Sequence, residues 1–413
     1  MNFVYRYNTL RMPYDLFSAE TKRISVKTKM HLSSTAVTIE QKQFDALFHT
    51  LVNNGYQIVG PTVREGAIVY DAITSSKDLP IGFTQEQSAG KYKLARRKDE
   101  AYFGFNTIPQ SWKKIFHPPT LTLCRSKREE KRYTILPGQS DIQKYALLGV
   151  RPCDLSAITI LDKVFISNPY SDSGYQKRRS DVFIVAINCS QLEGACFCAS
   201  MQTGPSASTG FDIALTEIIE KDRHYFVAEV GTEKGEAVLR KIPHKKAENH
   251  EIELAENLIE KTASEIKRTV DTANIAEFLY KNSEHARWQN IAKRCLTCGN
   301  CTMVCPTCFC TTIEDVTDLS GNDASRIRKW DSCFTLDFSY IHGGSIRSSV
   351  MSRYRQWLTH KFASWHHQFG SSGCVGCGRC ITWCPVGIDV TEELNAIRNT
   401  EQLNPSTKST KEK

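Results

Sequence analysis

Long hydrophobic runs are missing from this sequence. The longest apolar stretches, such as residues 181–189 (DVFIVAINC), are far shorter than the roughly 18 residues that a membrane-spanning helix needs. The N-terminal residues 1–30 include basic side chains but contain no uninterrupted apolar segment and no small-residue cleavage site, so no secretory signal is predicted. These absences together predict a cytoplasmic protein without a membrane span.

The familiar nucleotide-binding signatures are also missing. No GxGxxG follows a predicted strand and no GxxxxGK[ST] is present, so no nucleotide site of these kinds is expected. The net charge of +8 arises from 53 Lys and Arg against 45 Asp and Glu. Because the basic residues are spread along the chain and form no long stripe, no nucleic-acid partner is predicted.

Cysteine is what the sequence has in abundance, with sixteen residues. Cytoplasmic thiols are kept reduced, so a disulfide framework is a poor explanation and metal or redox cofactors remain. Eight of the cysteines form two runs with the spacing CxxCxxCxxxCP, which is typical of bacterial ferredoxins that hold two 4Fe-4S clusters. In that spacing the fourth cysteine of each run binds the other cluster. The predicted ligands are Cys295, Cys298, Cys301 and Cys384 for cluster I, and Cys374, Cys377, Cys380 and Cys305 for cluster II.

Zinc is the alternative cofactor, since CxxC pairs also form tetrahedral zinc sites. Two complete runs, each followed by a proline (Pro306 and Pro385), favour iron–sulfur clusters over zinc. Three further cysteines, Cys308, Cys310 and Cys333, either hold another metal or pack as small buried side chains, and packing is the favoured interpretation.

The region before the cysteine runs has an α/β pattern. Residues 145–150 and 182–188 read as buried strands, and residues 155–165 as a helix capped by Asp154. An earlier helix is expected within residues 37–55. If the two strands are parallel, cysteines that follow them lie at one edge of the sheet, where open α/β sheets bind ligands. A third cluster or a zinc site is therefore predicted, with scattered buried cysteines as the alternative; its ligands are Cys153, Cys189, Cys196 and Cys198.

Two residues near this third group are candidates for cofactor binding. Arg151 either stabilises the negative charge of a cluster or forms an ordinary salt bridge. Gly204 lies in the loop 203–210, whose backbone N–H groups either cradle a cofactor phosphate or only form a turn.

The fold class expected from these patterns is an α/β N-terminal domain followed by an α+β dicluster ferredoxin-like domain with a long helical insertion. The predicted boundaries are an N-terminal extension at 1–33, the α/β domain at 34–285, the dicluster domain at 286–400 and a disordered tail at 401–413.

The chain resembles the beta subunit of soluble NiFe hydrogenases, the sulfhydrogenases, and the iron–sulfur subunit of anaerobic sulfite reductase, which belongs to the same iron–sulfur family. The resemblance is carried by GVRPCDLSAITILDKVF, NCSQLEGACFCASMQTGP, CLTCGNCTMVCPTCFC, WDSC and CVGCGRCITWCPVGID. It implies a non-catalytic electron-transfer subunit. Its partners would be a flavin- and NAD(P)-binding diaphorase subunit together with the small and large NiFe hydrogenase subunits, or sirohaem sulfite reductase subunits.

Two further hypotheses stay open at the level of sequence. One is an iron–sulfur sensing or binding module that has no role in a redox complex. The other is a chain with catalysis of its own, which would use the loop at 194–210 as a flavin or substrate site.

Overall fold

The structure is a computed structural model that describes residues 35–403, except residues 131, 139–142, 168 and 192–193. The predicted N-terminal extension lies outside the described residues, as does the part of the predicted tail from 404 onward. Among the described residues, no helix combines the length and apolar character that a bilayer crossing requires.

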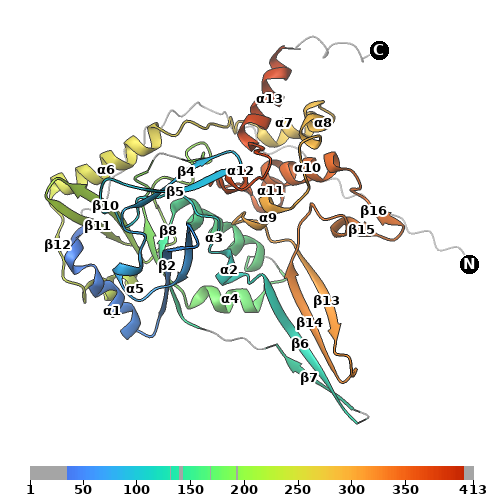
Figure 1. Ribbon diagram of the computed structural model, residues 1–413, viewed down its shortest axis with the longest axis horizontal. Coiled ribbons are helices and arrows are strands. Elements are labelled where there is room, and N and C mark those ends of the chain that lie inside the picture. The colour runs from blue at the N-terminus through green and yellow to red at the C-terminus, as the bar shows by residue number, and fades with distance from the viewer. Residues whose placement is uncertain (1–34, 131, 139–142, 168, 192–193, 404–413) are drawn as a thin grey trace, which may run out of the picture. The chain divides into compact units, whose positions relative to one another are not determined.

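A mixed sheet of eight strands organises the first part of the chain, in the order β12-β1-β11-β10-β9-β8-β2-β3 (Figure 1). Strands β10, β9, β8 and β2 pair in parallel, and the outer pairs are antiparallel. The predicted parallel pairing of residues 145–150 with 182–188 is thus confirmed. The strands are β1 (Val37–Glu40), β2 (Gln57–Arg64), β3 (Ala67–Ala72), β8 (Tyr145–Val150), β9 (Phe183–Ile187), β10 (Ile213–Glu220), β11 (Arg223–Val230) and β12 (Lys245–Lys246).

Helices cover both faces of this sheet. Because side chains alternate along a strand, β11 directs Phe226 and Ala228 into the core that includes α1, and Tyr225 and Val227 into a second core that includes Ala255 of α6. The helices of this region are α1 (Asp45–Asn53), α2 (Lys113–Phe116), α3 (Pro152–Phe165), α4 (Ser173–Ser180), α5 (Glu233–Leu239) and α6 (Asn249–Ser264), with the 3-10 turns η1 (Gln41–Gln43) and η2 (Ser76–Asp78).

The helix expected within residues 37–55 begins later than its pattern suggested. Residues 37–40 form β1, which pairs with β11 and β12. The β-branched side chains of Val37, Thr38 and Ile39 favour a strand once two neighbouring strands are available to pair with it.

Asp154 is not the cap of α3. The N-cap is Arg151, and the helix begins at Pro152, whose fixed φ suits the first helical position. Asp154 lies in the first turn, and its carboxylate accepts two hydrogen bonds from Arg379, at 2.7 and 2.8 Å. Both side chains are buried, so this ion pair fastens α3 to the second cysteine run.

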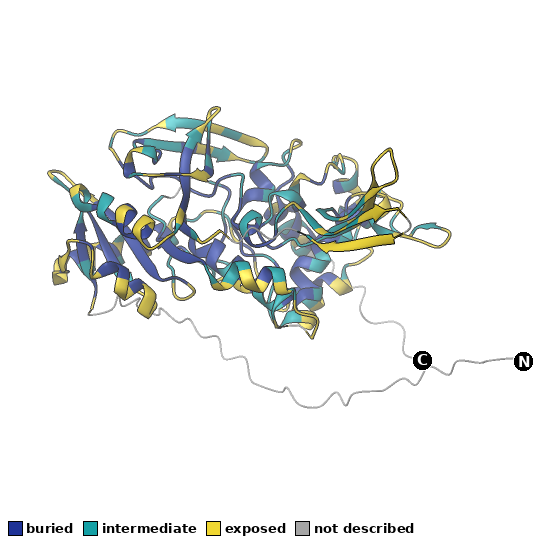
Figure 2. Ribbon diagram, turned by 90° about the horizontal axis from the view of Figure 1, so that it is seen from below, coloured by how far each residue is buried: buried dark blue, intermediate teal, exposed yellow. Residues whose placement is uncertain are grey.

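A second sheet combines two hairpins that lie far apart in the sequence, in the order β13-β14-β6-β7 (Figure 1). Its strands are β6 (Thr120–Glu129), β7 (Arg132–Pro137), β13 (Thr311–Thr317) and β14 (Asp323–Trp330). Figure 2 shows that these strands are largely exposed, unlike those of the eight-stranded sheet. A separate hairpin is formed by β4 (Phe83–Ser88) and β5 (Lys91–Arg96).

The insertion between the cysteine runs is not purely helical, which corrects the helical insertion expected from its sequence. It contributes β13 and β14, whose pairing with β6 supplies hydrogen bonds that local sequence does not reveal. It also contains the short hairpin β15 (Tyr340–Ile341) and β16 (Gly344–Ser345), η3 (Asp337–Ser339), α10 (Val350–Thr359), the π-helix η4 (His360–Ser364) and α11 (Trp365–Phe369).

Short helices surround both cysteine runs. Their apolar side chains form a further core, against which several of the cysteines pack. These helices are α7 (Ile275–Lys281), α8 (Arg287–Ala292), α9 (Asn300–Met303), α12 (Arg379–Thr382) and α13 (Val390–Leu403).

Candidate metal centres

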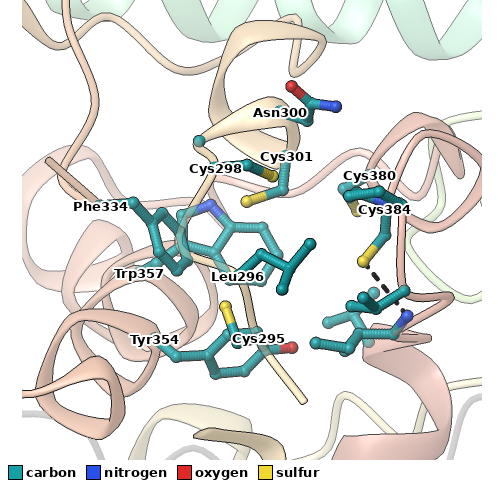
Figure 3. Close-up of a pocket in the computed structure, with 15 residues that line it drawn as sticks. Cys295, Leu296, Cys298, Asn300, Cys301, Phe334, Tyr354, Trp357, Cys380 and Cys384 are labelled. Atoms are coloured by element: carbon teal, nitrogen blue, oxygen red, sulfur yellow. Dashed lines mark hydrogen bonds between the residues drawn. The ribbon is translucent and has the colours of Figure 1, made fainter.

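Three thiols of the first cysteine run meet one thiol of the second run around a space that we call cavity I. Figure 3 shows the sulfur atoms of Cys295, Cys298, Cys301 and Cys384 around this space. The empty volume is about 450 Å³ and is open in part to solvent. Gly299, with φ of 74°, lets the chain turn between the second and third thiols.

Two unpaired donors line cavity I. The hydroxyl of Tyr354 and the indole N–H of Trp357 are buried, and neither has a hydrogen-bond partner among the described residues. Buried polar groups are rarely left unsatisfied, so the two donors indicate an acceptor within the cavity. Cluster sulfurs are acceptors of this kind, and hydrogen bonds to them tune the cluster potential.

The complementary set of thiols surrounds a second space, called cavity II, of about 390 Å³. Cys374, Cys377 and Cys380 come from the second run and Cys305 from the first. Cys380 lines both cavities, so the two spaces are neighbours. The structure thus brings together the two sets of four thiols that the spacing predicts; their role as ligands stays a prediction.

Backbone N–H groups point at three of these sulfur atoms, at distances of 3.3 to 3.4 Å. Such bonds favour the charged thiolate over the neutral thiol. The pairs are Thr297 with Cys295, Gly376 with Cys374, and Ile388 with Cys384.

Burial opposes that charge at most of the thiols. It raises the pKa of Cys374 to about 12, and it raises the pKa of Cys301 and of Cys380 well above the usual value for a thiol. A thiolate at these positions therefore needs a compensating cation, and metal binding displaces the proton. Within the described residues, no three His, Cys, Asp or Glu side chains are placed to hold a single metal ion; the two sets of thiols instead surround voids.

The four cysteines of the predicted third site also lie together. Cys153 is in the first turn of α3 and Cys189 follows β9, so both come just after the carboxyl ends of parallel strands. The thiols of Cys196 and Cys198 are hydrogen-bonded to each other. Cys198 interacts electrostatically with Cys153 and Cys189, which shows that all four thiols share one region.

This third group is packed directly against the second cysteine run. A Cβ atom on Gly378 would lie 2.4 Å from the carbonyl carbon of Ala195, and one on Gly376 would lie 2.7 Å from that of Phe197. The N–H of Phe197 donates to the carbonyl of Gly376 at 2.7 Å. Only glycine allows so close an approach, so the third group and cavity II are neighbours. Cys153 and Cys377 also interact electrostatically and share a buried apolar cluster.

Both predicted cofactor-binding residues lie beside the third group. The guanidinium of Arg151 is buried, donates to the carbonyls of Phe103 and Phe105 at 2.8 and 2.6 Å, and hydrogen-bonds the thiol of Cys189. A Cβ atom on Gly204 would lie 3.2 Å from the sulfur of Cys198. Neither placement tests whether these residues bind a cofactor.

Sequence reasoning missed a buried lysine at cavity II. Lys361 is 4% exposed and lies in the π-helix η4, a rare conformation that is frequent at functional sites. Its ammonium group donates to the hydroxyl of Thr307 at 2.6 Å, and that hydroxyl lies 3.3 Å from the sulfur of Cys305. Although burial alone would lower the pKa of Lys361, the neighbouring thiolates of Cys305 and Cys308 raise it. No motif marks this position, since the lysine is brought to the site by packing.

The three unassigned cysteines lie next to the cavities. The thiol of Cys308 is hydrogen-bonded to that of Cys305, and the thiol of Cys310 to that of Cys333. A second buried lysine, Lys113, donates to the carbonyl of Cys308 at 3.0 Å. These cysteines are therefore in contact with other thiols, which simple apolar packing does not require.

Comparison with known proteins defines the class of this chain. Residues 294–388 match the family described as 4Fe-4S dicluster domain. The chain thus carries a C-terminal dicluster domain, which indicates two 4Fe-4S clusters.

The comparison also confirms the resemblance stated from the sequence motifs. The chain is 29% identical over 367 residues to sulfhydrogenase 2 subunit beta of Pyrococcus furiosus. The matched region covers 88% of this chain and 98% of that relative.

Proposed function

We propose that this chain is the iron–sulfur electron-transfer subunit of a cytoplasmic multisubunit oxidoreductase, and specifically the beta subunit of a NAD(P)-linked NiFe sulfhydrogenase. In this role it relays electrons between the hydrogenase subunits and a flavin- and NAD(P)-binding partner, and it carries out no catalysis itself. The observation that carries the proposal is the pair of adjacent cavities, each lined by three thiols of one run and one of the other. Similarity along almost the whole length of a sulfhydrogenase beta subunit supports the choice of complex.

The ligands proposed for the cluster in cavity I are Cys295, Cys298, Cys301 and Cys384, and those for cavity II are Cys374, Cys377, Cys380 and Cys305. A 4Fe-4S cluster supplies a reversible one-electron couple when bound. The chain's own residues hold the thiolates through backbone N–H donors, exclude water by burial and place Lys361 beside cavity II.

A third cluster is proposed at Cys153, Cys189, Cys196 and Cys198, with Arg151 balancing part of its negative charge. The close packing of the loop around Ala195 and Phe197 on Gly376 and Gly378 supports a path from this group to cavity II. The three sites would then be arranged in series, with cavity II between the third group and cavity I.

Cavity I is proposed as the site of electron exchange with one partner protein of the complex. Cys298 is exposed, and the apolar side chain of Leu296 at the cavity is 61% exposed. Short distances favour electron transfer, and an exposed apolar rim favours docking of another protein.

Two measurements on anaerobically purified protein test the proposal. Iron and acid-labile sulfide should each reach about eight per chain with two clusters and about twelve with three. Co-purified proteins should include a flavoprotein and the large subunit of a NiFe hydrogenase. Zinc in place of iron would overturn the electron-transfer role, whereas a sirohaem partner would assign the chain to sulfite reduction instead.

A further inference from the structure

Three pairs of hydrogen-bonded thiols occur within the described residues. The pairs Cys196–Cys198 and Cys305–Cys308 each include at least one proposed cluster ligand. The third pair, Cys310–Cys333, includes none. Both of its members are therefore left as free thiols when the proposed clusters are bound, and they are already in contact.

The β13–β14 hairpin holds this pair together. Cys310 directly precedes β13 and Cys333 lies shortly after β14. The N–H of Asp331 donates to the carbonyl of Cys310 at 2.9 Å, which continues the strand pairing beyond Trp330. The backbone N–H of Cys333 also donates to the Cys310 sulfur. The contact between the two thiols thus belongs to the folded hairpin and not to a chance approach of two side chains.

The surroundings of the pair resemble those of reactive cysteines, which are partly exposed and lie near positive charge. Both residues are partly exposed, and the ammonium group of Lys361 interacts electrostatically with each. The hydrogen bond from Cys333 lowers the pKa of Cys310 to about 7, against the opposing effect of burial. Cys310 is therefore the member that more readily carries a thiolate.

We propose that Cys310 and Cys333 are a redox-active thiol pair that forms a disulfide by exchange with a low-molecular-weight disulfide. The Cys310 thiolate attacks one sulfur of the small disulfide, whose S–S bond breaks, and one small thiolate leaves. The Cys333 thiol then gives its proton to solvent and attacks the Cys310 sulfur, which releases the second small thiolate. Two protein sulfurs are oxidised, and one small disulfide is reduced to two thiols.

The consequence for the electron-transfer sites is electrostatic. Disulfide formation removes the thiolate of Cys310 from the neighbourhood of Lys361, which lines cavity II. The thiol state of the surroundings would thus alter the charge beside one cluster. This inference rests on the proposed function only in taking the ligand sets given above, which leave both thiols free.

The pair is tested on the full chain with its clusters, under anaerobic conditions, in buffers of reduced and oxidised glutathione at graded ratios. Acid quenching, alkylation without reduction and mass spectrometry measure the fraction of peptide carrying Cys310 linked to Cys333. We expect this fraction to rise about tenfold for each tenfold rise in the disulfide-to-dithiol exchange ratio until it saturates. Cys310→Ser and Cys333→Ala should abolish the link, and Cys124→Ser, in the distant strand β6, should leave it unchanged.

Iron and sulfide contents separate the possible outcomes. If wild-type protein holds its clusters but shows no linked peptide at any ratio, this inference is wrong and the proposed function stands. If the Cys310→Ser and Cys333→Ala variants both lose iron, the two cysteines are metal ligands and the thiol pair is refuted. If wild-type protein lacks iron–sulfur clusters, the proposed function fails, and the linked peptide still decides the thiol chemistry.

Discussion

Cavities I and II have the same four-thiol arrangement but different surroundings. The described side chains that line cavity I include Phe334, Tyr354 and Trp357, and none of its lining residues is charged. Leu296 and Val386, which line it as well, are 61% and 37% exposed. Cavity II has the buried ammonium group of Lys361 at its wall and the third thiol group behind it. Identical spacing in the sequence therefore encodes two different electrostatic environments.

The difference predicts a direction for electron flow. A cluster gains negative charge on reduction, so a buried positive charge favours its reduced form and raises its potential. Lys361 and its neighbour Lys113 form no ion pair with a carboxylate in the described part of the chain, which leaves the charge of thiolates and clusters to balance them. We expect the cluster in cavity II to be reduced more easily than the cluster in cavity I. Electrons that enter at the exposed cavity would then move inward.

The exchange of fourth ligands is the part of this comparison with the largest expected effect. Cys384→Ser should remove the cluster in cavity I, although its neighbours in sequence bind the cluster in cavity II, and about four irons per chain should be lost. The electron paramagnetic resonance signal that disappears should match the one lost in Cys298→Ser. Cys305→Ser should instead match Cys374→Ser. If Cys384→Ser matches Cys374→Ser, the ligands are not exchanged between the runs.

The contact of cavity II with the third thiol group gives the next largest effect. Gly378→Ala places a Cβ atom 2.4 Å from the backbone of Ala195 at a φ of 76°, so we expect a loss of roughly 2–5 kcal/mol in unfolding free energy. Gly370→Ala is the matched control, since its φ is 67° but no atom lies within 4 Å. It should cost roughly 1–2 kcal/mol from backbone strain alone. Denaturant unfolding followed by circular dichroism measures both, and equal losses would show that the contact is unimportant.

Much of the site could be predicted because its chemistry is written in local spacing. The CxxCxxCxxxCP runs predict the two sets of thiols that the cavities bring together, and the strand at 145–150 predicts where Cys153 lies. The comparison with dicluster domains supports the cofactor class but tests no individual ligand. The ligand sets therefore remain predictions, as does the third cluster.

The surroundings of the thiols could not be predicted because they depend on contacts between distant segments. Lys361 reaches cavity II through a π-helix within the insertion, and Asp154 pairs with Arg379, which is 225 residues away. The helical interpretation of the insertion failed at β13 and β14 for the same reason, since their partner β6 lies nearly 200 residues earlier in the chain. Local periodicity carries no information about such partners.

Removing the buried charge at cavity II tests the predicted order of potentials. Lys361→Met keeps much of the side-chain volume and should lower the potential of the cavity II cluster by roughly 1–3 kcal/mol per electron, for an effective dielectric constant of about 20. Lys361→Arg keeps the charge and should stay closer to wild type. Redox titration followed by electron paramagnetic resonance measures each cluster. A shift confined to cavity I, or no shift in Lys361→Met, would contradict the assigned role of the lysine.

The unpaired donors of cavity I predict the smallest shift. Tyr354→Phe removes one hydroxyl that has no partner among the described residues, and the potential of the cavity I cluster should fall by roughly 1 kcal/mol per electron because a hydrogen bond to the reduced cluster is lost. The cluster in cavity II should be unaffected. Tyr340→Phe is the control, since Tyr340 lies in β15 and is 64% exposed. If Tyr354→Phe leaves the cavity I potential unchanged while Lys361→Met shifts that of cavity II, the two environments differ through charge alone and the buried donors of cavity I do not contribute.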